Sequence, residues 1–151
     1  WMGRYIERAD MTLRLLDVKY YVLLPETDVV GGGRDYHQWT SVLYATSAMR
    51  AFHHVYRGDY SPWKIADFLI LNQAFPRSVA FCYNEIGSSL DRLAAMHHTR
   101  SACHGTAQEM RARLHDAEMG ELFQEDLHAF ILDAITVTGR LSRELHRTYH
   151  F

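Results

Sequence analysis

The chain has 151 residues, of which 48% are hydrophobic and 23% are charged, and its formal net charge is −2. This composition is too apolar for a disordered chain, yet charged residues interrupt every window before it reaches the roughly 18 apolar residues of a membrane span. The slight negative charge gives no general attraction to nucleic acid or to an anionic membrane, so we expect neither as a partner.

The length of the chain fits one domain with one core, which we place at residues 1–151. The two cysteines, Cys82 and Cys103, are too few for a disulfide framework and form no Cys-x-x-Cys pair, which favours a reducing, cytoplasmic location. The sequence starts at Trp1, with no residue before it to cap a helix. We therefore expect that it begins inside a helix of a longer parent chain.

The first segment, residues 1–24, has the clearest helical pattern. Its apolar residues recur at steps of three and four, as in helices that pack on other helices; they are Met2, Ile6, Ala9, Leu13, Leu16, Tyr20 and Leu23. Leu15, Val18 and Val22 form a second, shorter apolar stripe. A helix with two apolar faces is expected to lie at the centre of the fold. Pro25 ends it, and the glycine run at 31–33 indicates a linker.

Further helices follow with short connections and no alternating strand pattern. Asp35 and Ser61-Pro62 indicate two helix starts, whereas Thr106 and Glu109 fit a capping box. The helices are expected at 35–56, 62–71, 76–97, a segment after Thr106, and 120–146. The chain is thus predicted to be an all-α antiparallel bundle of about six helices with the first helix central.

The histidines and cysteines do not indicate a metal or catalytic centre. Glu125 and His128 form a Glu-x-x-His step, but a di-metal bundle needs this step on two helices and the chain has no second one. We therefore favour a solvated or hydrogen-bonded face and expect no metal and no cofactor. Cys82 lies in an apolar helical setting beside Phe81, which favours an inert buried thiol over a nucleophile.

Charged side chains on the first helix are the more specific candidates. Glu7 can pair with Arg4 three residues away, and Asp10 with Arg14 four residues away. If the helix is central, a guanidinium such as that of Arg8 can also hold a carboxylate or a phosphate. We favour ion pairs that fix the bundle over ligand binding, because buried charges need partners whatever their function.

Several motifs at fixed spacing resemble those of one bacterial family. They lie at 1–10, 14–18, 36–39, 52–56, 61–63, 68–72 and 75–79. Together they resemble the alpha-E domain, a helical domain of uncharacterised function that is named for its Glu-Arg motif. After about Leu93 the likeness is looser.

The resemblance implies which residues form the family signature. Glu7 and Arg8 correspond to the Glu-Arg motif, and the structural signature residues are Tyr5, Asp10, Asp17, Trp63 and Pro76. Family members are about twice as long and carry two related helical halves, so this chain resembles one half. The missing half, or a second copy in a homodimer, is then expected to cover an exposed apolar seam.

The resemblance also implies a function. Alpha-E proteins occur beside, or fused to, circularly permuted ATP-grasp proteins, which implies a part in making or modifying peptide-like amides. The chain is therefore expected to be a non-catalytic partner of an ATP-grasp ligase. The alternative is an enzyme or ligand-binding domain that uses Arg4, Glu7 and Arg8, together with Arg77 at a helix N-terminus, to hold a carboxylate or phosphate. No catalytic residue can be assigned, and whether the chain is an enzyme stays open.

Overall fold

A computed structural model describes residues 1–21 and 33–150 of the chain. This part contains eight helices and no strand, as an all-α bundle requires. The helices are α1 (Met2–Tyr21), α2 (Gly33–Ala45), α3 (Met49–Tyr56), α4 (Pro62–Leu71), α5 (Val79–His97), α6 (Ala102–Asp116), α7 (Met119–Glu125) and α8 (Leu127–Tyr149). The predicted fold class is confirmed, with two more helices than expected.

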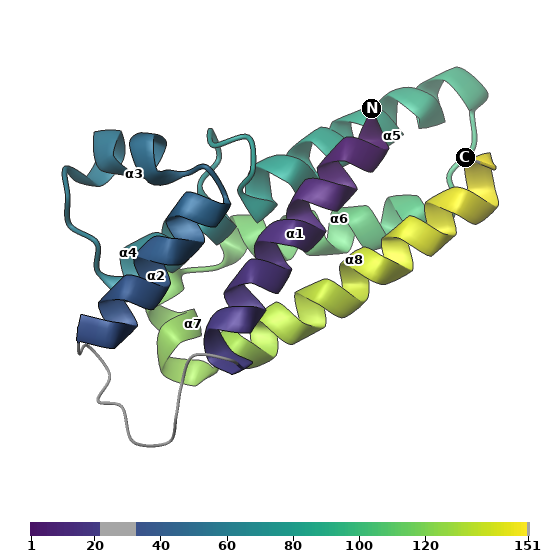
Figure 1. Cartoon of the computed structure of the whole chain (residues 1–151). Coiled ribbons are helices and arrows are strands. Elements are labelled where there is room, and N and C mark those ends of the chain that lie inside the picture. Colours follow the sequence, from purple (N-terminus) through teal and green to yellow (C-terminus); the bar gives the residue numbers. More distant parts are fainter. Residues whose placement is uncertain (22–32, 151) are drawn as a thin grey trace.

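Helix α1 lies at the centre of the bundle, as its pattern predicts. It packs along α5 and α8 and also touches α2 and α4 (Figure 1). Helices α1 and α8 are antiparallel, because Asp17 near the end of α1 contacts His128 at the start of α8. The apolar seam of α1 accounts for this position, since Ala9, Leu13 and Leu16 are fully buried.

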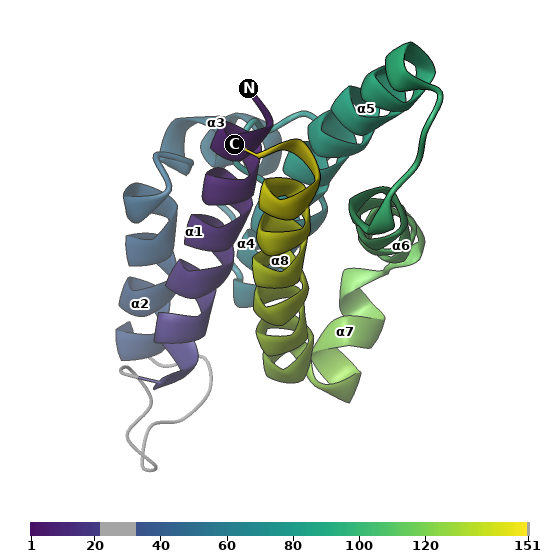
Figure 2. The same cartoon turned by 90° about the vertical axis from the view of Figure 1, so that its right-hand side faces the viewer.

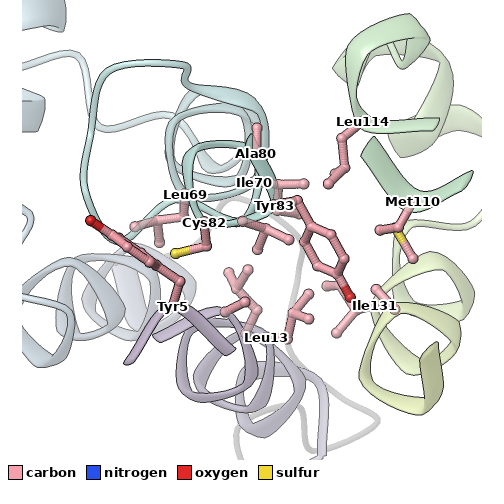
Figure 3. Close-up of a cluster of buried hydrophobic side chains, with 14 of the residues drawn as sticks. Tyr5, Leu13, Leu69, Ile70, Ala80, Cys82, Tyr83, Met110, Leu114 and Ile131 are labelled. Atoms are coloured by element: carbon pink, nitrogen blue, oxygen red, sulfur yellow. The ribbon is translucent and has the colours of Figure 1, made fainter. Parts of the chain in front are cut away.

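The core forms where α1, α4, α5, α6 and α8 meet (Figure 3). Tyr83 of α5 points into this space, and its phenol oxygen lies 2.8 Å from the hydroxyl oxygen of Thr138 in α8. The Thr138 hydroxyl donates its hydrogen to the carbonyl of Ala134, so Tyr83 is the donor to Thr138. A buried polar pair of this kind links α5 to α8 across the core.

The prediction of one helix over 35–56 is wrong, because this segment forms two helices, α2 and α3. Thr46 bonds back to the carbonyl of Val42, and Ser47 adopts a left-handed conformation with φ 56°. A side chain that competes for a helix carbonyl, followed by a left-handed residue, ends a helix. Asp35 is not an N-cap, since α2 already begins at Gly33. The predictions for residues 22–32, including Pro25, lie outside the described residues.

The helix expected at 120–146 is also two helices. Asp126 separates α7 from α8 and caps α8 by accepting the N–H of Ala129 at 3.0 Å. Likewise α6 does not begin at Thr106: Ser101 precedes it, and a capping box joins Ser101 to His104. Asp126 and Ser101 are short polar N-cap residues. No glycine or proline, which mark a helix end more plainly in sequence, stands beside either of them.

Two other details differ from expectation. Helix α4 has the predicted bounds, but α5 begins at Val79 rather than at Pro76, with Ser78 as its N-cap. The second apolar stripe of α1 is only partly buried, since Val18 is 45% exposed.

No helix in the described residues is long and apolar enough to cross a membrane.

Candidate functional site

The turn between α4 and α5 is closed by two side chains. The Asn72 side-chain oxygen accepts the N–H groups of Ala74 and Phe75 at 2.9 Å and 2.8 Å. The Ser78 hydroxyl donates to the backbone carbonyl of Asn72 and accepts the N–H of Phe81 at 3.1 Å. These bonds cap α5 and hold the α4–α5 turn in one shape.

Two side chains of helix α1 donate hydrogen bonds to backbone carbonyl groups of this turn. The buried hydroxyl of Thr12 donates to the carbonyl of Arg77 at 2.8 Å. One turn earlier, the Arg8 guanidinium donates to the carbonyl of Pro76 at 3.4 Å and lies 5.7 Å from the ring of Tyr5. The Arg8 side of α1 therefore faces the α4–α5 turn.

Cys82 lies just behind this contact and is fully buried. Burial raises the pKa of its thiol to about 12, although the positive charges of Arg8 and Arg77 act in the opposite direction. These two guanidinium groups are therefore close enough to the thiol to act on one group. A thiol with so high a pKa stays protonated at neutral pH, which supports the inert interpretation of Cys82.

Glu7 behaves differently from its neighbour Arg8. Its side chain is exposed and makes no hydrogen bond or ion pair with any described residue. The expected Arg4–Glu7 pair is not formed, since Arg4 instead lies 4.9 Å from the ring of Trp1. The expected Asp10–Arg14 pair is confirmed, with 2.7 Å between the joined atoms.

The remaining signature residues lie apart from one another. Tyr5 is buried and packs against Phe81, with ring centroids 6.1 Å apart. Asp17 accepts a hydrogen bond from His128 over 2.9 Å and joins α1 to α8. Trp63 lies on α4 and is 47% exposed. The structure brings together Arg8, Pro76 and Arg77, but not Trp63 or Asp17, around the α4–α5 turn.

Two hollows of the described surface lie apart from this turn. One, the α1–α5 hollow, has a volume near 610 Å³ and is mostly apolar; it is lined by Trp1, Met2, Gly3, Ser89, Arg92, Leu93 and Met96. The other is polar, with a volume near 540 Å³, and is lined by Asn84, Gln108, Arg111, Ala112, His115 and Asp116. Neither is lined by Glu7, Arg8 or Arg77.

The two residues of the Glu-x-x-His step belong to different helices in the structure. Glu125 ends α7, whereas His128 belongs to α8 and bonds to Asp17. Among residues 1–21 and 33–150, no three His, Cys, Asp or Glu side chains gather in a way that could hold a metal ion.

Sequence reasoning missed several polar residues of the interior, among them Lys19 and His104. Lys19 is buried on α1, and its ammonium lies 5.1 Å from the ring of Trp39. Its place three residues after Leu16, on the buried seam, was the available signal. His104 is buried as well, and a ring nitrogen accepts the N–H of Ser101 at 3.0 Å. Its signal was the Ser-x-x-His spacing of a capping box, with an imidazole nitrogen in place of a carboxylate.

Comparison with known proteins adds one finding to this geometry. The model of a family described as a predicted alpha-helical domain with a conserved ER motif matches residues 1–150. The Glu-Arg step occurs once in the chain, at Glu7 and Arg8. No curated protein and no solved structure matches the chain.

Proposed function

Because the chain belongs to the Alpha-E family, we propose that it is a non-catalytic helical module that docks on a partner protein through the face of α1 that carries Glu7. We further propose that the partner is an amide-bond-forming ligase of the ATP-grasp class. The docking role is supported by the geometry of the Glu-Arg motif. The class of partner is supported by the genomic setting of the family alone.

The observation that carries the proposal is that the two residues of the motif have different surroundings. Arg8 serves the fold, since it donates to the carbonyl of Pro76. Glu7 is exposed and has no partner among the described residues. A charged residue that a family conserves, and that does nothing for its own fold, is expected to act on another molecule.

The surroundings of Glu7 are suited to a protein surface. Exposed side chains follow one another along α1 at steps of three and four and therefore share one face; they are Arg4, Glu7, Met11, Arg14 and Val18. We call them the α1 outer stripe. Apolar side chains among charged ones are typical of an interface that forms between two folded proteins.

The competing role, a carboxylate or phosphate site, needs Arg4, Glu7, Arg8 and Arg77 to converge on one ligand. Arg8 and Arg77 meet at the α4–α5 turn, but Glu7 lies on the exposed side of α1 and Arg4 lies over the ring of Trp1. A site of this kind usually sits in a concave surface with convergent polar groups. The non-catalytic role is therefore favoured.

The test is association of the natural protein with an ATP-grasp protein of the kind that occurs beside members of the family, measured by size-exclusion chromatography and biolayer interferometry. Glu7→Gln is expected to weaken binding about tenfold or more, the effect of losing a central polar contact. Glu121→Gln, an exposed change on α7, serves as the matched control and is expected to bind as the wild type does.

Absence of association in the wild-type protein, or equal binding by both variants, would overturn the docking role. A separate titration with inorganic phosphate addresses the competing role. A rise in melting temperature with phosphate that Arg77→Ala removes would favour a ligand site at the N-terminus of α5 over docking.

A further inference from the structure

Charge is distributed unevenly along the second half of the chain. Residues 114–139 contain no Lys or Arg. The acidic residues of this stretch are Asp116, Glu118, Glu121, Glu125, Asp126 and Asp133. In contrast, the last turns of α8 carry Arg140, Arg143 and Arg147 with a single acid, Glu144. One end of α8 is therefore acidic and the other basic.

The basic end of α8 lies beside the first turn of α1 (Figures 1 and 2), and Arg92 and Met96 of α5 line one hollow with that turn. Four arginines at this end make no ion pair with a described acidic residue; they are Arg4, Arg92, Arg143 and Arg147. Arg92 only donates to the hydroxyl of Ser89, at 3.3 Å. This end of the bundle therefore attracts negative charge from outside the chain.

The α1–α5 hollow opens at the same end. Among the described residues that line it, Trp1 and Met96 are 72% and 73% exposed, and Arg92 carries a charged side chain. A Cβ atom added to Gly3 would meet no other atom within 4 Å, so the glycine leaves the hollow open beside α1. An apolar hollow with a cation in its lining suits an apolar side chain that has an acidic neighbour.

Taking these observations together, we infer that this end of the bundle binds an acidic amphipathic helix of the partner protein, whose apolar side chains enter the α1–α5 hollow while its carboxylates face the four arginines. The inference rests on the proposed docking function and adds the chemistry of the partner segment. Helix-in-groove binding uses apolar anchors at steps of three and four residues, with charges beside them to set orientation.

An anionic membrane is the other surface that a basic, apolar end can attract. Membrane-binding faces present apolar side chains that protrude into the lipid. Here the apolar side chains line a hollow near 610 Å³, which receives side chains better than it inserts into lipid. The protein segment is therefore the favoured occupant.

The experiment uses two fluorescent peptides with the same leucines at helical spacing, one with glutamates and the other with lysines at the remaining positions. Binding to the natural protein is followed by fluorescence anisotropy. The glutamate peptide is expected to bind at least about tenfold more tightly than the lysine peptide, and raised salt is expected to reduce the difference. Equal binding of the two peptides would overturn the inference.

Two variants test the site itself. Gly3→Leu adds a side chain to the lining of the hollow, at a position where a Cβ atom meets no other atom within 4 Å, and is expected to weaken binding of the glutamate peptide about tenfold, the scale of one lost anchor. Gly120→Leu, at a glycine on α7 with equally open space, is its control. Arg92→Glu is expected to weaken binding to a similar extent, with Arg50→Glu on the exposed face of α3 as the control. Wild-type binding by Gly3→Leu and Arg92→Glu would overturn the inference.

The same variants separate this inference from the docking function. If Glu7→Gln abolishes association with the ATP-grasp protein while Gly3→Leu and Arg92→Glu leave it unchanged, the docking function stands and the acidic-helix inference fails. Binding to vesicles that contain phosphatidylserine, lost in Arg92→Glu without any peptide binding, would assign the site to lipid and also overturn it.

Discussion

Thr12 donates its hydroxyl hydrogen to the carbonyl oxygen of Arg77 at 2.8 Å, across 65 residues of sequence. The bond joins the central helix to the α4–α5 turn, at a position where Thr12 is only 2% exposed. A buried carbonyl without a donor loses its hydrogen bonds to water and gains no other. This bond is therefore expected to contribute more to the free energy of unfolding than an average surface hydrogen bond.

We predict that Thr12→Val lowers the free energy of unfolding by about 1–3 kcal/mol, because it keeps the shape of the side chain and leaves the Arg77 carbonyl unpaired. Urea denaturation measures the change. The control is Thr136→Val on the exposed side of α8, where the hydroxyl only bonds back to Leu132; its expected effect is below about 0.5 kcal/mol. Similar losses in the two variants would contradict the proposed role of the bond.

His104 is predicted to carry its ring hydrogen on Nε2 rather than on Nδ1. Its Nδ1 accepts the N–H of Ser101 at 3.0 Å, so Nε2 must carry the hydrogen that reaches the carbonyl of Leu90 at 3.2 Å. Long-range proton–nitrogen NMR correlations report the tautomer directly. A proton on Nδ1 would rule out this capping box.

The same arrangement predicts a cost for losing the ring. His104→Ala leaves the N–H of the N-cap residue Ser101 without its ring acceptor and removes the second bond to the carbonyl of Leu90, so we expect a loss of about 1–2 kcal/mol in the free energy of unfolding. His115→Ala is the control, because His115 is exposed and bonds only to its neighbour Asp116. Equal effects of the two substitutions in thermal unfolding would argue against the role of His104.

Tyr83 is predicted to make stability fall at high pH. Burial raises the pKa of its phenol from 10.0 to about 12. The unfolded chain therefore loses this proton first as pH rises. The contribution is complete below pH 10 and is lost between pH 10 and about 12, with a size on the order of 3 kcal/mol.

Chemical denaturation across this range tests the prediction for Tyr83. Tyr56 adds to the same slope, since burial and its bond to Asp67 raise its pKa to about 12. Tyr83→Phe is expected to flatten the pH dependence in part, whereas Tyr44→Phe, at an exposed position, should keep the wild-type slope. A wild-type slope in Tyr83→Phe would show that the phenol is not the titrating group.

The thiols of Cys82 and Cys103 are predicted to resist modification in the folded protein. Both are fully buried, and burial raises the pKa of Cys82 to about 12, so little thiolate forms at neutral pH. Reaction with a thiol reagent at pH 8 should proceed only as fast as the protein opens. Ser41→Cys, on the exposed face of α2, should react at once; equally fast labelling of Cys82 would disprove the inert role.

Local patterns predicted most of the helices because helix formation depends on residues three and four apart. The seam of α1, the start of α4 at Ser61-Pro62, and the Asp10–Arg14 pair are of this kind. The breaks at Thr46 and Asp126 were missed, since each depends on a side chain competing with the backbone for hydrogen bonds, a competition that sequence spacing does not decide.

The sequence by itself determined that α1 is an amphipathic helix with Glu7 and Arg8 next to each other. It also determined that these two side chains point about 100° apart, because each residue advances a helix by that angle. Only the tertiary structure decided that Arg8 meets the carbonyl of Pro76 while Glu7 faces outward. Which direction is buried depends on where α5 and the α4–α5 turn lie, and their contacts with α1 join residues more than 60 positions apart.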